Sequence, residues 1–189
     1  TQLGSDIDGE AAGDESGRKL TINGDGNILA IGAYLNDGNG SNAGHVRVYE
    51  YSNNSWTQLG NDIDGEATGD GFGFSVAIND VGNRIAIGGI FNDSNGTDAG
   101  HVKIYDYENG SWNLVQSEIN GESPNDRYGI ALSLNSSGNR IIIGSKENDG
   151  NGSAAGHVRI FDLKPAPDTV GPTMTITATD GSNAVADGA

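Results

Sequence analysis

The amino-acid sequence predicts an all-β protein built from three copies of one four-stranded antiparallel unit. Glycine is abundant, at 31 of 189 residues, and aromatic content is only 6%, which suits short strands joined by tight turns. Equivalent residues recur every 56 positions, as His45, His101 and His157 do. Apolar residues cluster in short runs such as "RIAIGGI", which distinguishes the chain from a disordered sequence.

The second copy shows the four strands of the unit. Residues 74–78 ("FSVAI") alternate, and after the turn "NDVGN" residues 84–90 ("RIAIGGI") are apolar on both faces, as in a strand that is covered on both sides. Residues 101–107 ("HVKIYDY") alternate again, and the turn "ENG" leads to residues 111–116 ("SWNLVQ"). Gly- and Asn-rich turns between alternating runs are hairpin signals, so we expect four antiparallel strands in each copy.

A four-stranded unit repeated at this spacing predicts β-propeller blades. A flat β-solenoid, the alternative, has much shorter rungs. The repeats start near residues 1, 57 and 113; the first opens with "TQLG" in the place of a fourth strand, and the last ends after the third strand, "HVRIFDL". Closed propellers use about four to eight blades. We therefore expect residues 1–163 to be the final three blades of a larger ring, incomplete here, with the chain a fragment of a longer protein.

The composition changes after the third repeat. Residues 164–172 ("KPAPDTVGP") contain three of the four prolines and predict a linker. Residues 173–189 begin a Thr-rich alternating strand. This pattern predicts the truncated start of another β-domain.

The charge limits the possible partners. The formal net charge is −16, with only 10 Lys and Arg residues, so no clustered basic surface for nucleic acid or anionic lipid is expected. No apolar run is long enough to insert directly into a membrane. The chain lacks Cys, which excludes disulfides and thiol chemistry. Cations, neutral glycans and basic protein surfaces remain possible partners.

The acidic residues are expected to gather on one rim. In an up-and-down blade, the loop before the first strand and the loop between the second and third strands lie at the same end, and most of the 26 acids fall in these loops. The segments "DIDGEAAGD" and "DIDGEATGD" put several carboxylates on loops that Gly can bend, an arrangement that suits calcium. The candidate calcium ligands are Asp6, Asp8, Glu10, Asp14, Asp62, Asp64, Glu66 and Asp70. The third copy, "EINGESPND", loses both leading aspartates, and we favour the alternative of a solvated loop with Asx-turns.

Other residues of this rim are candidates for ligand binding. The opening loops, such as "NDGNGS", offer Asp37, Asn39 and Asp93, although Asn and Gly also accept positive φ, so we favour a purely conformational role. The third copy departs most from the others, and a specialised spot is expected at Asp126, Arg127 and Tyr128. The histidines fall on separate blades, where we expect them to pair with nearby acids.

Catalysis is not expected. The sequence has no nucleophile motif, phosphate loop or His-rich metal cluster. Near-equivalent copies favour a scaffold or a multivalent binder over an enzyme.

The second copy also carries the residues of a known repeat. "FGFSVAI" with Phe72-Gly73, then "IAIGG", then "AGHVKIY" resembles the FG-GAP repeats that form the propeller blades of integrin alpha chains and of many bacterial secreted or surface proteins. The other copies read Ser16-Gly17 and Tyr128-Gly129 at the FG position. Calcium-binding FG-GAP blades have an acidic loop between the first and second strands, where this chain has short turns. The family's calcium site is therefore not expected. The tail from residue 173 is similar to the start of bacterial immunoglobulin-like domains.

The resemblance implies a non-enzymatic propeller segment of an exported, multi-domain bacterial surface protein. It would serve adhesion, or recognition of a protein or glycan at a cell surface, through its acidic rim. Its partners within the same protein would be the remaining blades and the immunoglobulin-like domains. One alternative is a calcium- or carbohydrate-binding accessory module of an extracellular enzyme, and another is a catalytic propeller with its site in the channel. Calcium is the only cofactor that the residues suggest.

Overall fold

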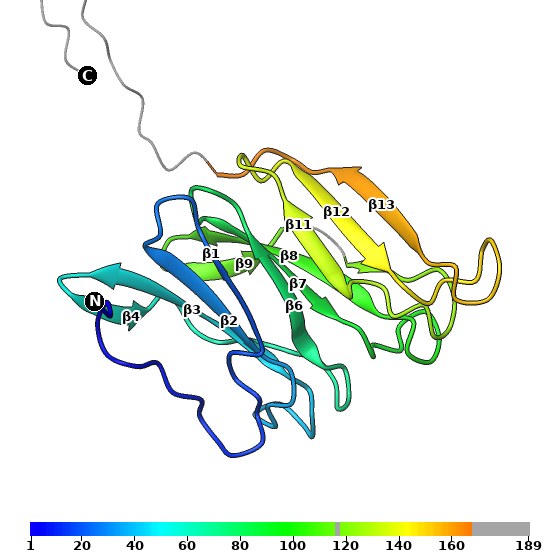
Figure 1. The fold of residues 1–189 in the computed structure, drawn as a ribbon, viewed down its shortest axis with the longest axis horizontal. Helices are drawn as coiled ribbons and strands as arrows, with labels where there is room; N and C mark the ends of the chain where they lie inside the picture. The colour runs from blue at the N-terminus through cyan, green and yellow to red at the C-terminus, as the bar shows by residue number, and fades with distance from the viewer. Residues whose placement is uncertain (116–117, 168–189) are drawn as a thin grey trace, which may run out of the picture.

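A computed structural model describes residues 1–115 and 118–167. These residues form 13 β-strands in three antiparallel sheets (Figure 1). The described part contains no helix that could cross a membrane.

The first sheet comprises β1 (Lys19–Ile22), β2 (Ile28–Ala33), β3 (His45–Ser52), β4 (Ser55–Gln58) and β5 (Ile63–Asp64). The second comprises β6 (Phe72–Ile78), β7 (Arg84–Gly89), β8 (His101–Glu108), β9 (Ser111–Leu114) and β10 (Ile119–Asn120). The third comprises β11 (Ala131–Leu134), β12 (Arg140–Ser145) and β13 (His157–Asp162). The predicted all-β class is confirmed.

Each sheet follows the chain in an antiparallel, up-and-down order, and the outer strand is divided. In the first sheet β4 pairs with residues 49–52 of β3, while β5 pairs with residues 45–46 of the same strand. β9 and β10 divide the edge of β8 in the same way. The unit therefore has the four predicted strands with an interruption in the fourth. Within residues 118–167 the third sheet has three strands, as its sequence indicates.

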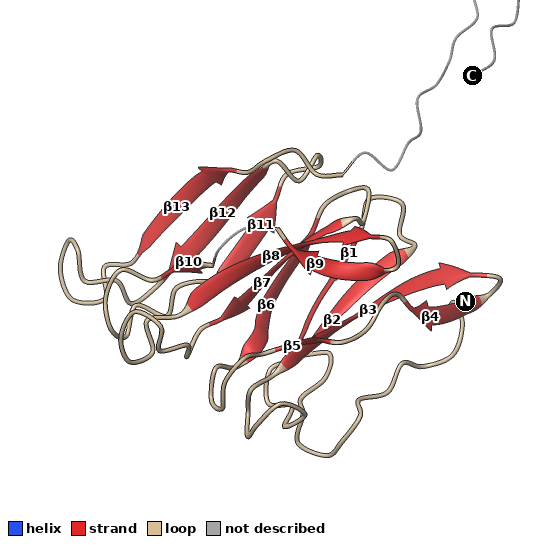
Figure 2. Ribbon diagram, turned by 180° about the vertical axis from the view of Figure 1, so that it is seen from behind, coloured by secondary structure: helices blue, strands red, loops and turns tan. Residues whose placement is uncertain are grey.

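The three sheets stack face to face in chain order (Figures 1 and 2). The first strand of each later repeat packs against the preceding sheet: β6 lies against β1 and β2, and β11 lies against β6 and β7. Two apolar cores fill the spaces between sheets. The strand β7 serves both, because Ile85 and Ile87 point into one core and Ala86 into the other. This double burial explains the uninterrupted apolar run in its sequence.

The two outer faces of the stack carry apolar side chains that no described sheet covers. Ile142, Val158 and Ile160 are exposed on the third sheet, with Val158 at 66%. Leu20 and Ile22 are exposed on the first sheet. Exposed apolar faces of this kind mark places where another structural element packs.

Glycine allows neighbouring sheets to approach closely. A Cβ on Gly88 of β7 would lie 2.5 Å from the carbonyl oxygen of Gly129 in the next repeat. A Cβ on Gly32 of β2 would lie even closer to the carbonyl oxygen of Gly73. Gly73 and Gly129 both have φ near +90°, so each side of the contact requires glycine for a different reason.

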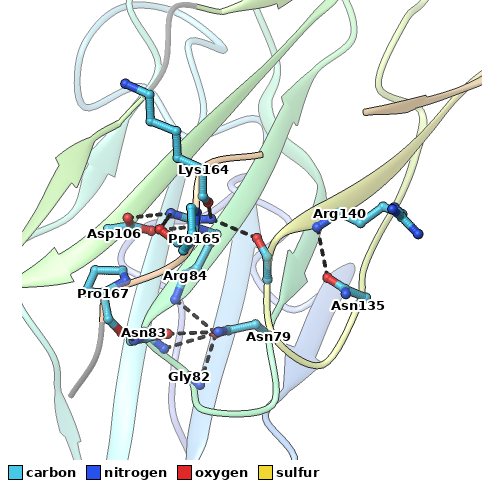
Figure 3. A network of polar contacts seen from close by, with 11 residues as sticks. Asn79, Gly82, Asn83, Arg84, Asp106, Asn135, Arg140, Lys164, Pro165 and Pro167 are labelled. Carbon is cyan, nitrogen blue, oxygen red and sulfur yellow. Dashed lines mark hydrogen bonds and ion pairs between the residues drawn. The ribbon is translucent and has the colours of Figure 1, made fainter. Parts of the chain in front are cut away.

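Short hairpin turns lie at one end of the strands and the long acidic loops at the other (Figure 1). In the turn between β6 and β7, the Asn79 side-chain oxygen accepts hydrogen bonds from the backbone N–H groups of Gly82, Asn83 and Arg84 (Figure 3). Asn23 and Asn135 accept equivalent bonds in the other repeats. These are Asx-type turns, as the sequence indicates.

Arg84 fastens the beginning of the predicted linker to the second repeat (Figure 3). Its guanidinium is almost fully buried and donates to both Asp106 carboxylate oxygens, at 2.6 and 2.7 Å. It also donates to the carbonyl oxygens of Gly138, Lys164 and Pro165. Residues 164–167 of the predicted linker 164–172 are thus packed against the repeats. The remainder, with the predicted domain start at 173–189, lies outside the described residues.

We predict that Gly88→Ala destabilises the protein by about 1–3 kcal/mol, because the new methyl group forces the second and third sheets apart. Gly144→Ala is the matched control: its Cβ would meet Ala131 at 3.5 Å, an ordinary contact. Urea unfolding measures both. Equal losses in the two variants would contradict the close-approach explanation.

Arg84→Met is expected to cost about 3–5 kcal/mol, because it leaves the Asp106 carboxylate buried without its partner. The equivalent pair in the third repeat, Arg140 with Asp162, is exposed at 59% and 77%, so Arg140→Met should cost under about 1 kcal/mol. Denaturant midpoints of the two variants provide the comparison, and a similar loss in both would rule out a special role for Arg84.

Candidate functional site

The acidic loop of each later repeat is clasped by the opening loop of the repeat before it. The Asn39 side chain donates to the Gly65 carbonyl oxygen at 2.7 Å, and Asn95 donates to the Gly121 carbonyl oxygen at the same distance. Backbone bonds between the loops join Gly65 to Gly44, Gly69 to Ser41, Gly71 to Asn42 and Phe72 to Ala43. The recurring "NDGNGS" loop therefore does more than connect two strands, because its backbone and its second Asn form hydrogen bonds to the next repeat.

Several predicted acids have structural roles inside these loops. Asp14 and Asp70 are buried and accept hydrogen bonds from the side chains of Asn36 and Asn92. Each also accepts a bond from a backbone N–H three residues earlier. Burial and these bonds assign both carboxylates to loop structure. They do not lie on the surface beside the other candidate calcium ligands.

The rim candidates are also accounted for locally. Asp37 and Asp93 accept backbone N–H bonds within their own loops, from Asn42 and Asp98. These bonds are the Asx-type contacts expected of a conformational role.

The predicted specialised spot in the third repeat is largely internal. Asp126 is buried and accepts from Asn148. Tyr128 is fully buried in the core between the second and third sheets, and burial raises its pKa to about 12. Arg127 alone is partly exposed; it pairs with Glu147 at 3.3 Å and lies over the Phe91 ring. Asp126 and Tyr128 are thus placed where a ligand on the rim cannot reach them.

One group of titratable side chains does converge among the described residues. It joins Glu10, from the loop before β1, to His45 at the start of β3 and Asp62 just before β5. The His45 Nδ1 atom lies 3.8 Å from a carboxylate oxygen of Glu10, 3.8 Å from one of Asp62 and 4.0 Å from one of Asp64. The pairing of β5 with β3 sets Asp64 opposite His45 and so fixes this arrangement.

The cluster is strongly negative but has one neighbouring cation. Arg47 lies 3.5 Å from the other Glu10 oxygen and donates to the Asp8 carbonyl oxygen at 2.8 Å. Burial, followed by repulsion from Asp62, raises the pKa of Asp64, and His45 partly opposes this. Proximity of like charges in this way is a feature of functional sites.

The remaining candidate calcium ligands lie apart from this cluster. Asp6 accepts from the Gln2 side chain. Glu66 forms an ion pair with Lys103, whose hydrogen bond lowers the pKa of the Glu66 carboxyl group. The structure therefore does not gather Asp6, Asp8, Glu10 and Asp14 around one point. It joins Glu10 to acids from the second predicted segment.

The same positions are more fully paired in the second repeat. There the His101 Nδ1 atom lies 2.9 Å from Glu118, and Asn120 replaces Asp64. In the third repeat Glu122 lies 3.9 Å from His157 and 3.0 Å from Arg159. A Glu that pairs with the basic residue two positions after the His is thus common to all repeats. Each His also lies near a carboxylate, in agreement with the expected pairing of histidines to acids.

Sequence reasoning did not join His45 to Glu10 and Asp62, because it considered the histidines as ligands of one shared ion, which their separate blades exclude, and it treated each acidic segment as a separate loop. The useful signal was the alternation in "DIDG", where Ile63 is buried and its neighbouring aspartates face outward. Recognising this as the second half of the fourth strand would have placed it beside "GHVRVY".

Comparisons with known proteins agree with the repeat pattern. Residues 7–49 match the family model described as the FG-GAP repeat. No curated protein matches. The match confirms the resemblance for the first repeat, and the 56-residue spacing relates the other two repeats to it.

Solved structures with a similar fold include a putative 6-phosphogluconolactonase from Bacteroides uniformis ATCC 8492. The two are 13% identical with a TM-score of 0.51, and the match covers 78% of this chain and 37% of that one. At this identity the likeness concerns the fold alone. A Pyrococcus horikoshii acylaminoacyl peptidase is 15% identical over 69% of this chain and 20% of its own, but its TM-score of 0.38 is too low to support an argument. This chain spans about a third or less of either structure.

We predict that stability falls as the pH drops below about 6.5, partly through His101. Burial lowers the pKa of His101, against the opposing hydrogen bond from Glu118, while Lys103 lowers it further and Asp70 raises it. The unfolded chain then binds the proton more readily, so stability rises with pH between the folded and unfolded pKa values, with a slope of at most about 1.4 kcal/mol per pH unit.

Urea midpoints between pH 5 and 7.5 measure this slope. His101→Asn should flatten the profile over that range relative to the unaltered chain. An unchanged slope in the variant would assign the pH dependence to other groups.

Proposed function

We propose that this chain is a segment of a β-propeller recognition module in an exported surface protein, and that it binds a basic protein partner through its acidic end. The support comes from the FG-GAP match at residues 7–49, the three stacked antiparallel sheets and the segregation of acids to one end. The proposal includes an immunoglobulin-like domain that begins at residue 173.

The observation that best supports a propeller is a groove on the third repeat, at the position where the second repeat contacts the repeat that follows it. In the second repeat Gly88 and Gly100 receive the backbone of Tyr128 and Gly129 from the next repeat. The equivalent residues of the third repeat, Gly144 and Gly156, instead line an open groove of about 440 Å³ together with His157 and Val158. A further repeat would fit this groove, as expected of a ring that continues.

The charge supports a basic partner. The net charge is −16, and acids that remain exposed at the acidic end include Asp8 and Glu15. A surface of one sign steers an oppositely charged partner and raises the association rate. Near-equivalent loops in successive repeats favour repeated weak contacts over a single catalytic centre.

The test compares two variants with the same change in charge. One neutralises the acidic end (Asp8→Asn, Glu15→Gln, Asp98→Asn), and the other neutralises acids near the hairpin turns (Asp25→Asn, Asp80→Asn, Glu108→Gln). Both are screened by surface plasmon resonance against arrays of matrix proteins and glycans at low and high salt. We expect capture by basic proteins, weakened about tenfold at low salt only in the first variant.

Equal losses in the two variants would contradict recognition through the acidic end. Salt-independent binding to neutral glycans would replace the proposed partner class with a carbohydrate.

A further inference from the structure

We infer that Glu10, His45, Asp62 and Asp64 form a divalent metal site, specific to the first repeat, that takes an ion of the Zn²⁺ class. These residues come from three segments: the loop before β1, the start of β3 and the second half of the outer strand at β5.

The first observation is the state of His45. Its side chain is only 2% exposed, yet the three carboxylate oxygens that face its Nδ1 atom stand at 3.8, 3.8 and 4.0 Å, beyond hydrogen-bond distance. A buried imidazole nitrogen surrounded by acceptors normally forms a direct bond to one of them. Here the His45 Nδ1 atom forms no direct hydrogen bond to any of these three carboxylates.

The second observation is that the distances between the ligand atoms are close to those of a metal site. Zn²⁺ binds nitrogen and oxygen ligands at about 2.0–2.2 Å, so a tetrahedral set holds its ligand atoms about 3.4 Å apart. The ligand atoms of Glu10, His45 and Asp62 all lie within 4.8 Å of one another. Asp64 lies outside this group of three but faces the same imidazole. The carboxylates of Glu10 and Asp64 are exposed at 44% and 49%, so both can change rotamer when an ion binds.

The charge of the cluster also fits a divalent ion. Three carboxylates face the imidazole, and the neighbouring Arg47 contacts the Glu10 oxygen opposite the one that faces His45. Arg47 thereby orients the Glu10 carboxylate while leaving its inner oxygen available, which is the role of an outer partner at a metal site. The excess of carboxylates over basic side chains at this point favours a divalent cation.

The second repeat provides an internal comparison. There His101 contacts Glu118 directly at 2.9 Å, Lys103 pairs with Glu66, and an amide (Asn120) takes the place of Asp64. The second repeat has one carboxylate fewer, and its His already has a direct hydrogen bond to a carboxylate. It therefore offers no equivalent arrangement. The site is therefore a feature of the first repeat and not of the repeat family.

The position of the site suggests what the ion does. In the second and third repeats the acidic loop is clasped by the preceding repeat. A metal bound by Glu10 together with residues of β3 and β5 would fasten the acidic loop of the first repeat to its own sheet as well. The imidazole ligand favours Zn²⁺ over calcium, which prefers oxygen donors alone.

The test uses the full 189-residue chain, treated with chelator and titrated with ZnCl₂ by calorimetry. We expect one ion per chain, with a rise in melting temperature on binding. Asp62→Asn combined with Asp64→Asn should weaken binding at least tenfold, while Glu118→Gln, the matched change in the second repeat, should leave it unaltered. With Co²⁺ as a probe, the visible absorption band should disappear in His45→Gln.

Failure to bind Zn²⁺, or equal affinity in the Asp62/Asp64 double variant and the unaltered chain, would overturn the proposal. Because both aspartates are partly exposed, their variants remain informative even if His45→Gln does not fold. Binding abolished by Glu118→Gln would place the ion in the second repeat and would equally overturn it.

Discussion

The architecture depends on the close approach of backbone to backbone between neighbouring sheets. Gly32 and Gly88 lie on the second strands of their repeats, and each receives the carbonyl group of a glycine in the following repeat. The receiving glycine needs to lack a Cβ, whereas the approaching glycine needs positive φ. Both conditions recur at the two junctions, so the contacting glycines repeat with the same 56-residue spacing as the rest of the unit. The two apolar cores then fill the space that this spacing defines.

The same contact explains why several acids in the long loops, such as Asp14 and Asp70, have structural roles. When the glycines are in contact, the acidic loop of one repeat lies against the opening loop of the repeat before it. The backbone N–H and C=O groups of the acidic loop must then find hydrogen-bond partners there. Asn39 supplies one such bond, and the Asp14–Asn36 pair fixes the loop from within. Repetition at these positions therefore reflects a repeated structural requirement. Residues that escape the requirement are the better indicators of function.

Much of the fold could be predicted from local pattern. Alternation and turn residues located the three main strands of every repeat, and the run "RIAIGGI" correctly indicated a strand that is buried on both faces. The interruption of the fourth strand was harder to predict, because the alternation in "DIDG" around Ile63–Asp64 is too short to distinguish a strand from a loop by itself. Tyr128 was placed on the rim because it follows charged residues, but its alignment with Phe72 already indicated a core position. The polar residues beside Tyr128 suggested a surface position, whereas its equivalence to Phe72 in the repeat indicated the core. The equivalence between repeats was the better guide.

A comparison of equivalent positions also shows where the repeats differ for a reason other than packing. The His, the basic residue two positions later and a Glu paired with that basic residue are present in all three copies. The outer strand beside them is not constant: Asp64 in the first repeat is Asn120 in the second. The Asn removes a charge, and the longer Glu118 reaches the imidazole that Asp62 does not reach. These two changes, together with Lys103 in place of Arg47, accompany the difference between the closed polar contact of the second repeat and the more negative cluster of the first. Because the strand pairing beside them is the same in both repeats, the contrast follows from the side chains and not from the course of the backbone.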